Sequence, residues 1–199
     1  MTFCAEPAMY EPCIVYESSS FLVLYKPPFM HTVPLRTGEK TLLDWCVKRY
    51  PEMDRVRGKT AGDKGILHRL DRETRGLVLA ALNQEAFENL KRQQEEDRIV
   101  KSYGALLAPP ALSPPGFPPL PPKLVKAFPP ESGATLYIES AFRAYGPGRK
   151  AVRPVTGLSG AARSAAGKNR LYRTALLAAK DEPPRLDGNA ENKFFYAEL

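Results

Sequence analysis

Apolar and polar residues follow one another along the chain in patterns that predict short strands separated by helices. Residues 21–28 (FLVLYKPP) predict a buried strand that ends at two prolines, because proline cannot donate to a sheet. Thr41 is a suitable N-cap for a helix over 42–50, where apolar residues recur at helical spacing. Pro51 is expected to end that helix.

The pattern resumes after a charged segment. Residues 77–82 are apolar and few, which predicts a central strand. Asn83 can cap a second helix over 84–97, which has acidic residues near its start. Further strands are expected over 99–108, 135–142, 171–179 and 194–199, and the last two are expected to form an antiparallel pair. This order predicts an α+β fold, with a mixed, mainly antiparallel sheet and flanking helices, rather than a bundle or a sandwich.

Three segments are predicted to be loops. Residues 109–130 hold ten of the twenty prolines, which favours an extended, polyproline-like connection. The sequence PPLPPK within it also resembles a PxxP ligand of SH3 domains, although a stiff connection between strands is the favoured interpretation. Residues 156–170 are small, polar and basic, and residues 181–192 are polar, so both are expected at the surface.

Positive charge is concentrated in two segments. The chain of 199 residues has a net charge of +7, yet residues 143–173 contain eight Lys or Arg and no acid. Residues 55–75 contain seven basic residues against Asp63, Asp71 and Glu73. Clustered basic charge favours a polyanionic partner, most often nucleic acid. A merely solvated basic surface is the alternative for either segment alone.

The remaining composition argues against a zinc protein, a secreted protein and a membrane protein. Cys4, Cys13 and Cys46 form no CxxC pair, and the two histidines are too few to complete a standard zinc set with them. The first residues contain acids and prolines where a signal peptide needs positive charge and an apolar stretch, and no apolar run is long enough to cross a bilayer. We therefore expect a soluble, cytoplasmic protein with reduced cysteines, no metal and no membrane association.

The segment that best suits chemistry is GILHRLDRETRGLVLAAL, residues 65–82. It places Asp71 between Arg69 and Arg72, directly before the apolar strand. A carboxylate flanked by cations stays ionised at neutral pH, and the same cations can bind a phosphate backbone. The sequence therefore predicts a basic or nucleophilic Asp beside a surface that binds polyanions.

Four segments resemble one known family in order and spacing. The sequence HRLDRETRGLVLAA resembles the HRLDxxTSGLLLxA signature of RluA-type RNA pseudouridine synthases. The preceding FLVLYKPPFMHTVP is similar to that family's first strand and KPxG turn, KSYGALL to its KxYxAL strand, and GPGRKAVRPV to its glycine-basic turn. The resemblance covers most of residues 20–199, which we expect to be a catalytic domain of this kind that lacks its C-terminal part, after an N-terminal extension over 1–19.

The resemblance implies an isomerase that converts uridine within rRNA or tRNA to pseudouridine, acting as a monomer without a cofactor. By the resemblance Asp71 is the catalytic residue, and Tyr103 matches an active-site tyrosine on which uracil can rest. Arg69 matches the residue that fills the space left by the flipped nucleotide. His68, Arg72 and Arg75 are the further candidates for RNA binding, although fixing the loop is the favoured role of His68, and Arg75, where the family usually has Ser, can instead pair with Asp71.

Three neighbouring residues are expected to support the loop. Thr74 and Gly76 are expected to shape its turn, with a side chain at Gly76 crowding the approach of backbone to ligand. Lys26 is expected to be an ion-pair partner rather than a substrate contact.

Other function classes stay open. The chain can be a non-catalytic RNA-binding protein derived from the same fold, using its basic segments and Tyr103 without breaking bonds. An aspartate-dependent hydrolase is a weaker alternative, because no partner acid, metal cluster or Ser/His pair lies at a suitable spacing. The absence of GxGxxG and GxxxxGK[ST] loops removes the sequence support for nucleotide cofactors.

The family pattern continues beyond the residues present. A strand like KFFYAEL leads in that family to a GRxHQIR-type segment whose arginine contacts the catalytic Asp, and Leu199 precedes it. The chain is then either part of a longer enzyme, which the intact HRLD sequence favours, or a degenerate relative. We expect residues 1–199 alone to show weak or no turnover and a form extended beyond Leu199 to be active, in an assay of pseudouridine formation. Equal activity of both forms would refute this.

Overall fold

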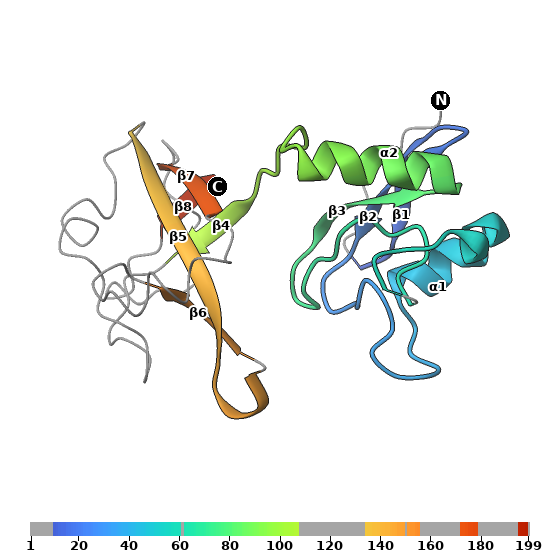
Figure 1. Cartoon of the computed structure of the whole chain (residues 1–199), viewed down its shortest axis with the longest axis horizontal. Coiled ribbons are helices and arrows are strands. Elements are labelled where there is room, and N and C mark those ends of the chain that lie inside the picture. The colour runs from blue at the N-terminus through green and yellow to red at the C-terminus, as the bar shows by residue number, and fades with distance from the viewer. Residues whose placement is uncertain are drawn as a thin grey trace. The chain divides into compact units, whose positions relative to one another are not determined.

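The computed structural model describes residues 10–60, 62–107, 134–149, 151–155, 172–178 and 195–198 (Figure 1). The chain divides into two compact units, Met1–Val100 and Lys101–Leu199. The expected division into an extension over 1–19 and a catalytic domain over 20–199 stays a prediction. Three predicted loops, 109–130, 156–170 and 181–192, lie outside the described residues.

The first unit contains an antiparallel sheet with the strand order β1-β2-β3. Its strands are β1 (Cys13–Glu17), β2 (Phe21–Lys26) and β3 (Gly76–Ala81). Pairing of β2 with β3 places Leu22 opposite Ala80 and Leu24 opposite Val78. The two predicted strands are present, whereas β1 lies in the segment that the sequence suggested only as an extension. Its register shifts between Ile14 and Tyr16, which breaks the alternating pattern that identifies a strand.

Both helices of this unit begin at the predicted caps. Helix α1 (Leu42–Val47) starts at Thr41, which forms a capping box with Asp44. Helix α2 (Gln84–Glu95) starts at Asn83, whose side chain accepts a hydrogen bond from the backbone N–H of Ala86 at 2.9 Å. Helix α1 ends before Pro51, and a 3₁₀ helix, η1 (Pro51–Arg55), follows.

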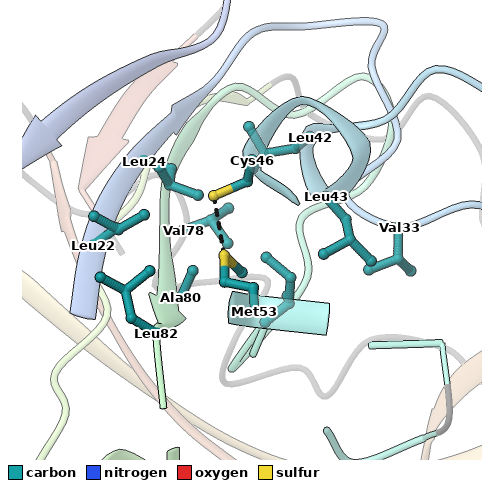
Figure 2. Close-up of a cluster of buried hydrophobic side chains, with 11 residues drawn as sticks. Leu22, Leu24, Val33, Leu42, Leu43, Cys46, Met53, Val78, Ala80 and Leu82 are labelled. Carbon is teal, nitrogen blue, oxygen red and sulfur yellow. Dashed lines mark hydrogen bonds between the residues drawn. The ribbon is translucent and has the colours of Figure 1, made fainter. Parts of the chain in front are cut away.

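The two helices cover opposite faces of the sheet, because strand residues of alternating position pack on different helices. Leu22, Leu24, Val78 and Ala80 form one buried cluster with side chains of α1 and η1 (Figure 2). In that cluster the sulfur atoms of Cys46 and Met53 lie 3.2 Å apart. Ala81 and the partly buried Leu79 contribute instead to the cluster around Phe87 of α2.

The second unit contains an antiparallel sheet with the strand order β4-β8-β7-β5-β6. Its elements are β4 (Gly104–Leu107), β5 (Thr135–Tyr145), η2 (Pro147–Arg149), β6 (Ala151–Val155), β7 (Tyr172–Ala178) and β8 (Phe195–Glu198). The predicted antiparallel pairing of the last two strands is confirmed, with Leu177 opposite Glu198. The strand expected over 99–108 begins only at Gly104, and β5 runs past its expected end to pair with β6.

The α+β class is confirmed, with one difference in its arrangement. The described strands form two sheets, one in each unit. Within each sheet, all neighbouring described strands pair in the antiparallel direction. Parallel pairing among the described residues is confined to an isolated bridge between His31 and Thr41.

Residues 65–67 extend the first sheet beyond β3. The N–H of Ala81 donates to the carbonyl of Gly65 at 2.8 Å, and the N–H of Leu67 donates to the carbonyl of Leu79 at 3.0 Å. A Cβ added to Gly65 would lie 2.1 Å from the carbonyl oxygen of Ala81. This close approach of Gly65 to the backbone of Ala81 requires glycine. The HRLD sequence leaves the sheet directly after the paired residues 65–67.

We predict that Gly65→Ala lowers the free energy of unfolding by about 2 kcal/mol or more, because the backbone must shift away from β3. The readout is urea unfolding followed by the fluorescence of Trp45, the single tryptophan of the chain. Gly62→Ala is the matched control, since a Cβ there meets nothing within 4 Å. Equal unfolding midpoints for the two variants would show that the close approach of Gly65 to Ala81 does not require glycine.

Candidate functional site

The HRLD sequence lies in a loop between residue 67 and β3, which we call the motif loop (residues 68–75). Its first residue is bonded to the sheet, because the N–H of Leu79 donates to Nε2 of His68 at 3.4 Å. This contact supports the loop-fixing role expected of His68, and its binding of RNA stays a prediction.

Lys26, at the end of β2, ties the motif loop to the turn that follows that strand. Its side chain is fully buried, and Nζ donates to the carbonyl oxygens of Pro27 at 3.0 Å, Met30 at 2.7 Å and Arg72 at 3.3 Å. An ammonium has three protons, so these three acceptors match its donor capacity. The expected ion pair is replaced by these carbonyl contacts.

The charge of Lys26 nevertheless depends on the motif loop. Burial lowers the pKa of its ammonium, while the nearby carboxylates of Glu73 and Asp71 raise it and Arg72 lowers it. The carboxylate of Asp71 therefore acts on Lys26 through space.

Thr32 fixes the centre of the loop from the other side. Its hydroxyl donates to the carbonyl of Leu70 at 3.0 Å and accepts from the N–H of the same residue at 3.1 Å. Thr32 is buried, so these two bonds satisfy polar groups that water does not reach. The backbone is thus held by hydrogen bonds on both sides of Asp71, at Leu70 before it and at the carbonyl of Arg72 after it.

A tight turn returns the chain to β3. The N–H of Thr74 donates to the carbonyl of Asp71 at 3.1 Å, and Gly76 has φ = 146°, which side chains rarely adopt. A Cβ at Gly76 would meet its nearest neighbour, Leu70, at 3.5 Å, an ordinary contact. Glycine is required here by backbone conformation, and the crowding of a ligand by a side chain at Gly76 stays a prediction.

The side chains of the loop point away from this buried support. Asp71, Arg72, Glu73 and Arg75 are all exposed. Arg72 lies 3.6 Å from the carboxylate of Glu73. Within the described part of the chain, no ion pair joins Arg75 to Asp71, so the alternative in which Arg75 neutralises Asp71 gains no support.

Arg69 is paired with an acid from the preceding segment. Its Nη2 donates to Oδ1 of Asp63, whose side chain is only 6% exposed. The other oxygen of Asp63 accepts from the N–H of Thr60 at 3.0 Å. A buried carboxylate needs such partners, so Asp63 holds Arg69 beside the motif loop while about half of the arginine stays exposed.

Phe29 lies beside Arg72, in the turn whose carbonyls Lys26 binds. Its ring is 61% exposed, and Cζ of Arg72 lies 5.8 Å from the ring centroid. Phe29 has φ = 63°, which for a residue with a side chain costs roughly 1–2 kcal/mol. It takes the glycine position of the KPxG pattern, which explains why the turn has this left-handed geometry.

Tyr103 belongs to the second unit and precedes β4. Its ring is 39% exposed, which suits contact with a ligand. Its role with Asp71 stays a prediction.

The candidate residues Arg69, Asp71, Arg72 and Arg75 all lie on the motif loop and are exposed, while their functional roles stay predictions. The roles of Thr32 and Asp63 were missed, because each acts on a loop residue through a contact that follows no helical or strand period. The signal available for Asp63 was its place as an acid inside a basic segment.

No group of three or more His, Cys, Asp or Glu among the described residues is arranged to hold a metal ion. Among the described helices, none has the length and apolar character needed to span a bilayer.

Comparison with known proteins finds similarity of the chain to one family. The sequence model described as RNA pseudouridylate synthase matches residues 20–157. A ribosomal large subunit pseudouridine synthase D from Blochmanniella floridana is 32% identical over 95 residues, 47% of this chain and 28% of that protein. The protein of the same description from Neisseria meningitidis serogroup B is 34% identical over 109 residues, 53% of this chain and 27% of that protein. The matched segment thus spans less than a third of either relative.

Two solved structures share the fold. Human RNA Pseudouridylate Synthase Domain Containing 1 matches with a TM-score of 0.54 and 19% identity, over 98% of this chain and 61% of that one. Human RNA Pseudouridylate Synthase Domain Containing 4 matches with a TM-score of 0.50 and 13% identity, over 94% of this chain and 57% of that one.

We predict that Lys26→Met lowers the free energy of unfolding by about 2 kcal/mol, because methionine fills the space but leaves three carbonyls without their donor. The motif loop should also be released locally, so trypsin should cleave after Arg72 and Arg75 faster than in the wild type. Lys91→Met is the control, since Lys91 is an exposed lysine with only a helical ion pair to Glu95. Identical stability and tryptic patterns for the two variants would contradict the role of Lys26.

Proposed function

The chain belongs to the RNA pseudouridylate synthase family, and on that basis we propose that it isomerises uridines within RNA to pseudouridines. The reaction detaches uracil from the ribose, turns it and rejoins it through carbon, so it is redox-neutral and needs no phosphate donor. Two of the relatives are ribosomal large subunit pseudouridine synthases, which favours the rRNA of that subunit over tRNA as the substrate. We further propose that the protein acts in the cytoplasm as a monomer.

The observation that carries this proposal is an exposed carboxylate on a fixed backbone. Asp71 is exposed, while the loop atoms on both sides of it are bonded to the buried residues Thr32 and Lys26. A catalytic group must be held within a narrow range of positions to react with a bound nucleotide. The loop meets this need without using the carboxylate itself as a support.

We propose Asp71 as the catalytic residue, acting either on the anomeric carbon as a nucleophile or on a ribose proton as a base. Both roles require the uridine to leave the helical stack. Arg69 would fill the space that the uridine leaves, and Tyr103 would contact the uracil ring. Arg72 and Arg75, both exposed beside Asp71, would bind RNA phosphates, and His68 would fix the loop from which they project.

The ion pair with Asp63 is compatible with the role of Arg69. A guanidinium has five N–H donors, and the contact with Asp63 uses Nη2. The exposed part of the side chain therefore keeps donors and one planar face for RNA while Asp63 limits its motion.

The alternative is a non-catalytic RNA-binding protein with the same fold. The exposed basic residues of the motif loop would serve both functions equally, so they do not discriminate between them. The two functions differ in what they require of Asp71, because catalysis needs its carboxylate whereas the binding of RNA phosphate by the neighbouring cations does not.

We predict that Asp71→Ala abolishes the adduct or rearranged product formed with RNA that contains 5-fluorouridine, while the Kd for RNA stays within about threefold of the wild type. A single event per molecule is sufficient for detection, so the assay does not depend on fast turnover. The readouts are denaturing gel electrophoresis for the adduct, mass spectrometry of the nucleosides for the product, and filter binding for Kd.

Glu73→Ala is the matched control, because it removes the same charge from an exposed position two residues away. It should keep full adduct formation. Adduct formation that survives Asp71→Ala, or that is lost equally in both variants, would contradict catalysis by Asp71. A change in affinity alone would favour the non-catalytic alternative.

A further inference from the structure

Phe29 is a residue that the proposed chemistry does not use. An isolated exposed apolar side chain needs no special explanation. Phe29 differs from that case because a bulky residue at φ = 63° is a backbone outlier, and such outliers concentrate at ligand-binding sites. A flexible or glycine-containing turn would avoid this strain.

The surroundings of Phe29 keep its ring accessible. Pro27 is fully buried, and Met30 packs against the first hydrophobic cluster. Both neighbours are also bound through their carbonyls by Lys26. The backbone of the turn is therefore anchored on both sides of Phe29.

The same lysine connects this aromatic ring to the motif loop. Nζ of Lys26 also binds the carbonyl of Arg72, the residue after Asp71. The guanidinium of Arg72 lies within cation–π distance of the Phe29 ring, at 5.8 Å from its centroid. An aromatic face and a cation are thus held together next to the exposed carboxylate.

We propose that Phe29 is a stacking platform for an unpaired RNA base next to the uridine that reacts at Asp71, with Arg72 binding the adjoining phosphate. An exposed aromatic ring beside an arginine is the combination that binds single-stranded nucleic acid, since every base offers a π face. Stacking at this position makes Phe29 a determinant of substrate choice, favouring uridines whose neighbour is unstacked. The inference rests on the proposed function and deepens it.

The test measures binding of a 5′-fluorescein-labelled U12 oligonucleotide by fluorescence anisotropy, with inorganic polyphosphate as a competitor that has charge but no bases. Phe29→Gly and Phe29→Leu should each weaken binding of U12 about tenfold and leave competition by polyphosphate unchanged. Phe29→Trp should bind U12 at least as tightly as the wild type. Arg72→Gln should weaken both ligands and reduce the salt dependence.

A second readout separates stacking from a structural role. Phe29→Gly removes the backbone strain, so its urea midpoint should stay equal to that of the wild type or rise while U12 affinity falls. A purely structural residue would lose stability and binding together. Tyr10→Leu, which removes another exposed aromatic ring from the same unit, should leave U12 affinity unchanged.

The outcomes also distinguish this inference from the proposed function. Unchanged U12 affinity in Phe29→Gly, with the Asp71-dependent adduct present, overturns the stacking role alone and leaves a protein partner as the reason for the exposed ring. Phe29-dependent U12 binding without any adduct, both from residues 1–199 and from a form extended beyond Leu199, supports stacking and overturns the isomerase. Failure of the wild-type chain to bind U12 overturns the stacking role as well.

Discussion

The candidate site depends on one buried ammonium. Nζ of Lys26 binds carbonyl oxygens from the turn after β2 and from Arg72, which lies 46 residues further along the chain. Burying a lysine is unfavourable, and the lowered pKa of Lys26 reflects that cost. Its three hydrogen bonds offset the cost and fix two irregular segments to each other, which apolar packing would do with far less precision in position.

The side chains that fix the motif loop differ from those that the loop exposes to solvent. The side chains that fix it, Lys26, Thr32 and His68, bond to backbone atoms of the turn after β2, of β3 or of the loop itself. The loop's own charged side chains are consequently left exposed. Because the loop's position does not depend on those side chains, their substitution can change ligand binding with little effect on the fold.

Sequence patterns predicted the locally determined features of this fold. Thr41 and Asn83 were identified as helix caps because a cap is formed within four residues. The bulged strand β1 was missed because its register shift breaks the alternation of its side chains. Strand β6 was missed because it is short, contains Arg153 and Pro154, and directly follows a glycine-containing turn. The contacts of Thr32 with Leu70 and of Lys26 with Arg72 join segments distant in sequence, so no local pattern encodes them.

Asp63 fixes the position of one arginine, Arg69, in the basic segment. Arg69 is surrounded in sequence by cations, and like charges alone would drive its side chain away from its neighbours. The buried carboxylate of Asp63 holds it in place, while the N–H of Thr60 satisfies the second oxygen. A carboxylate in the interior attracts the arginine without being accessible to compete with an RNA phosphate for the exposed cations. Asp71, by contrast, is exposed beside those cations, which fits the catalytic role proposed for it.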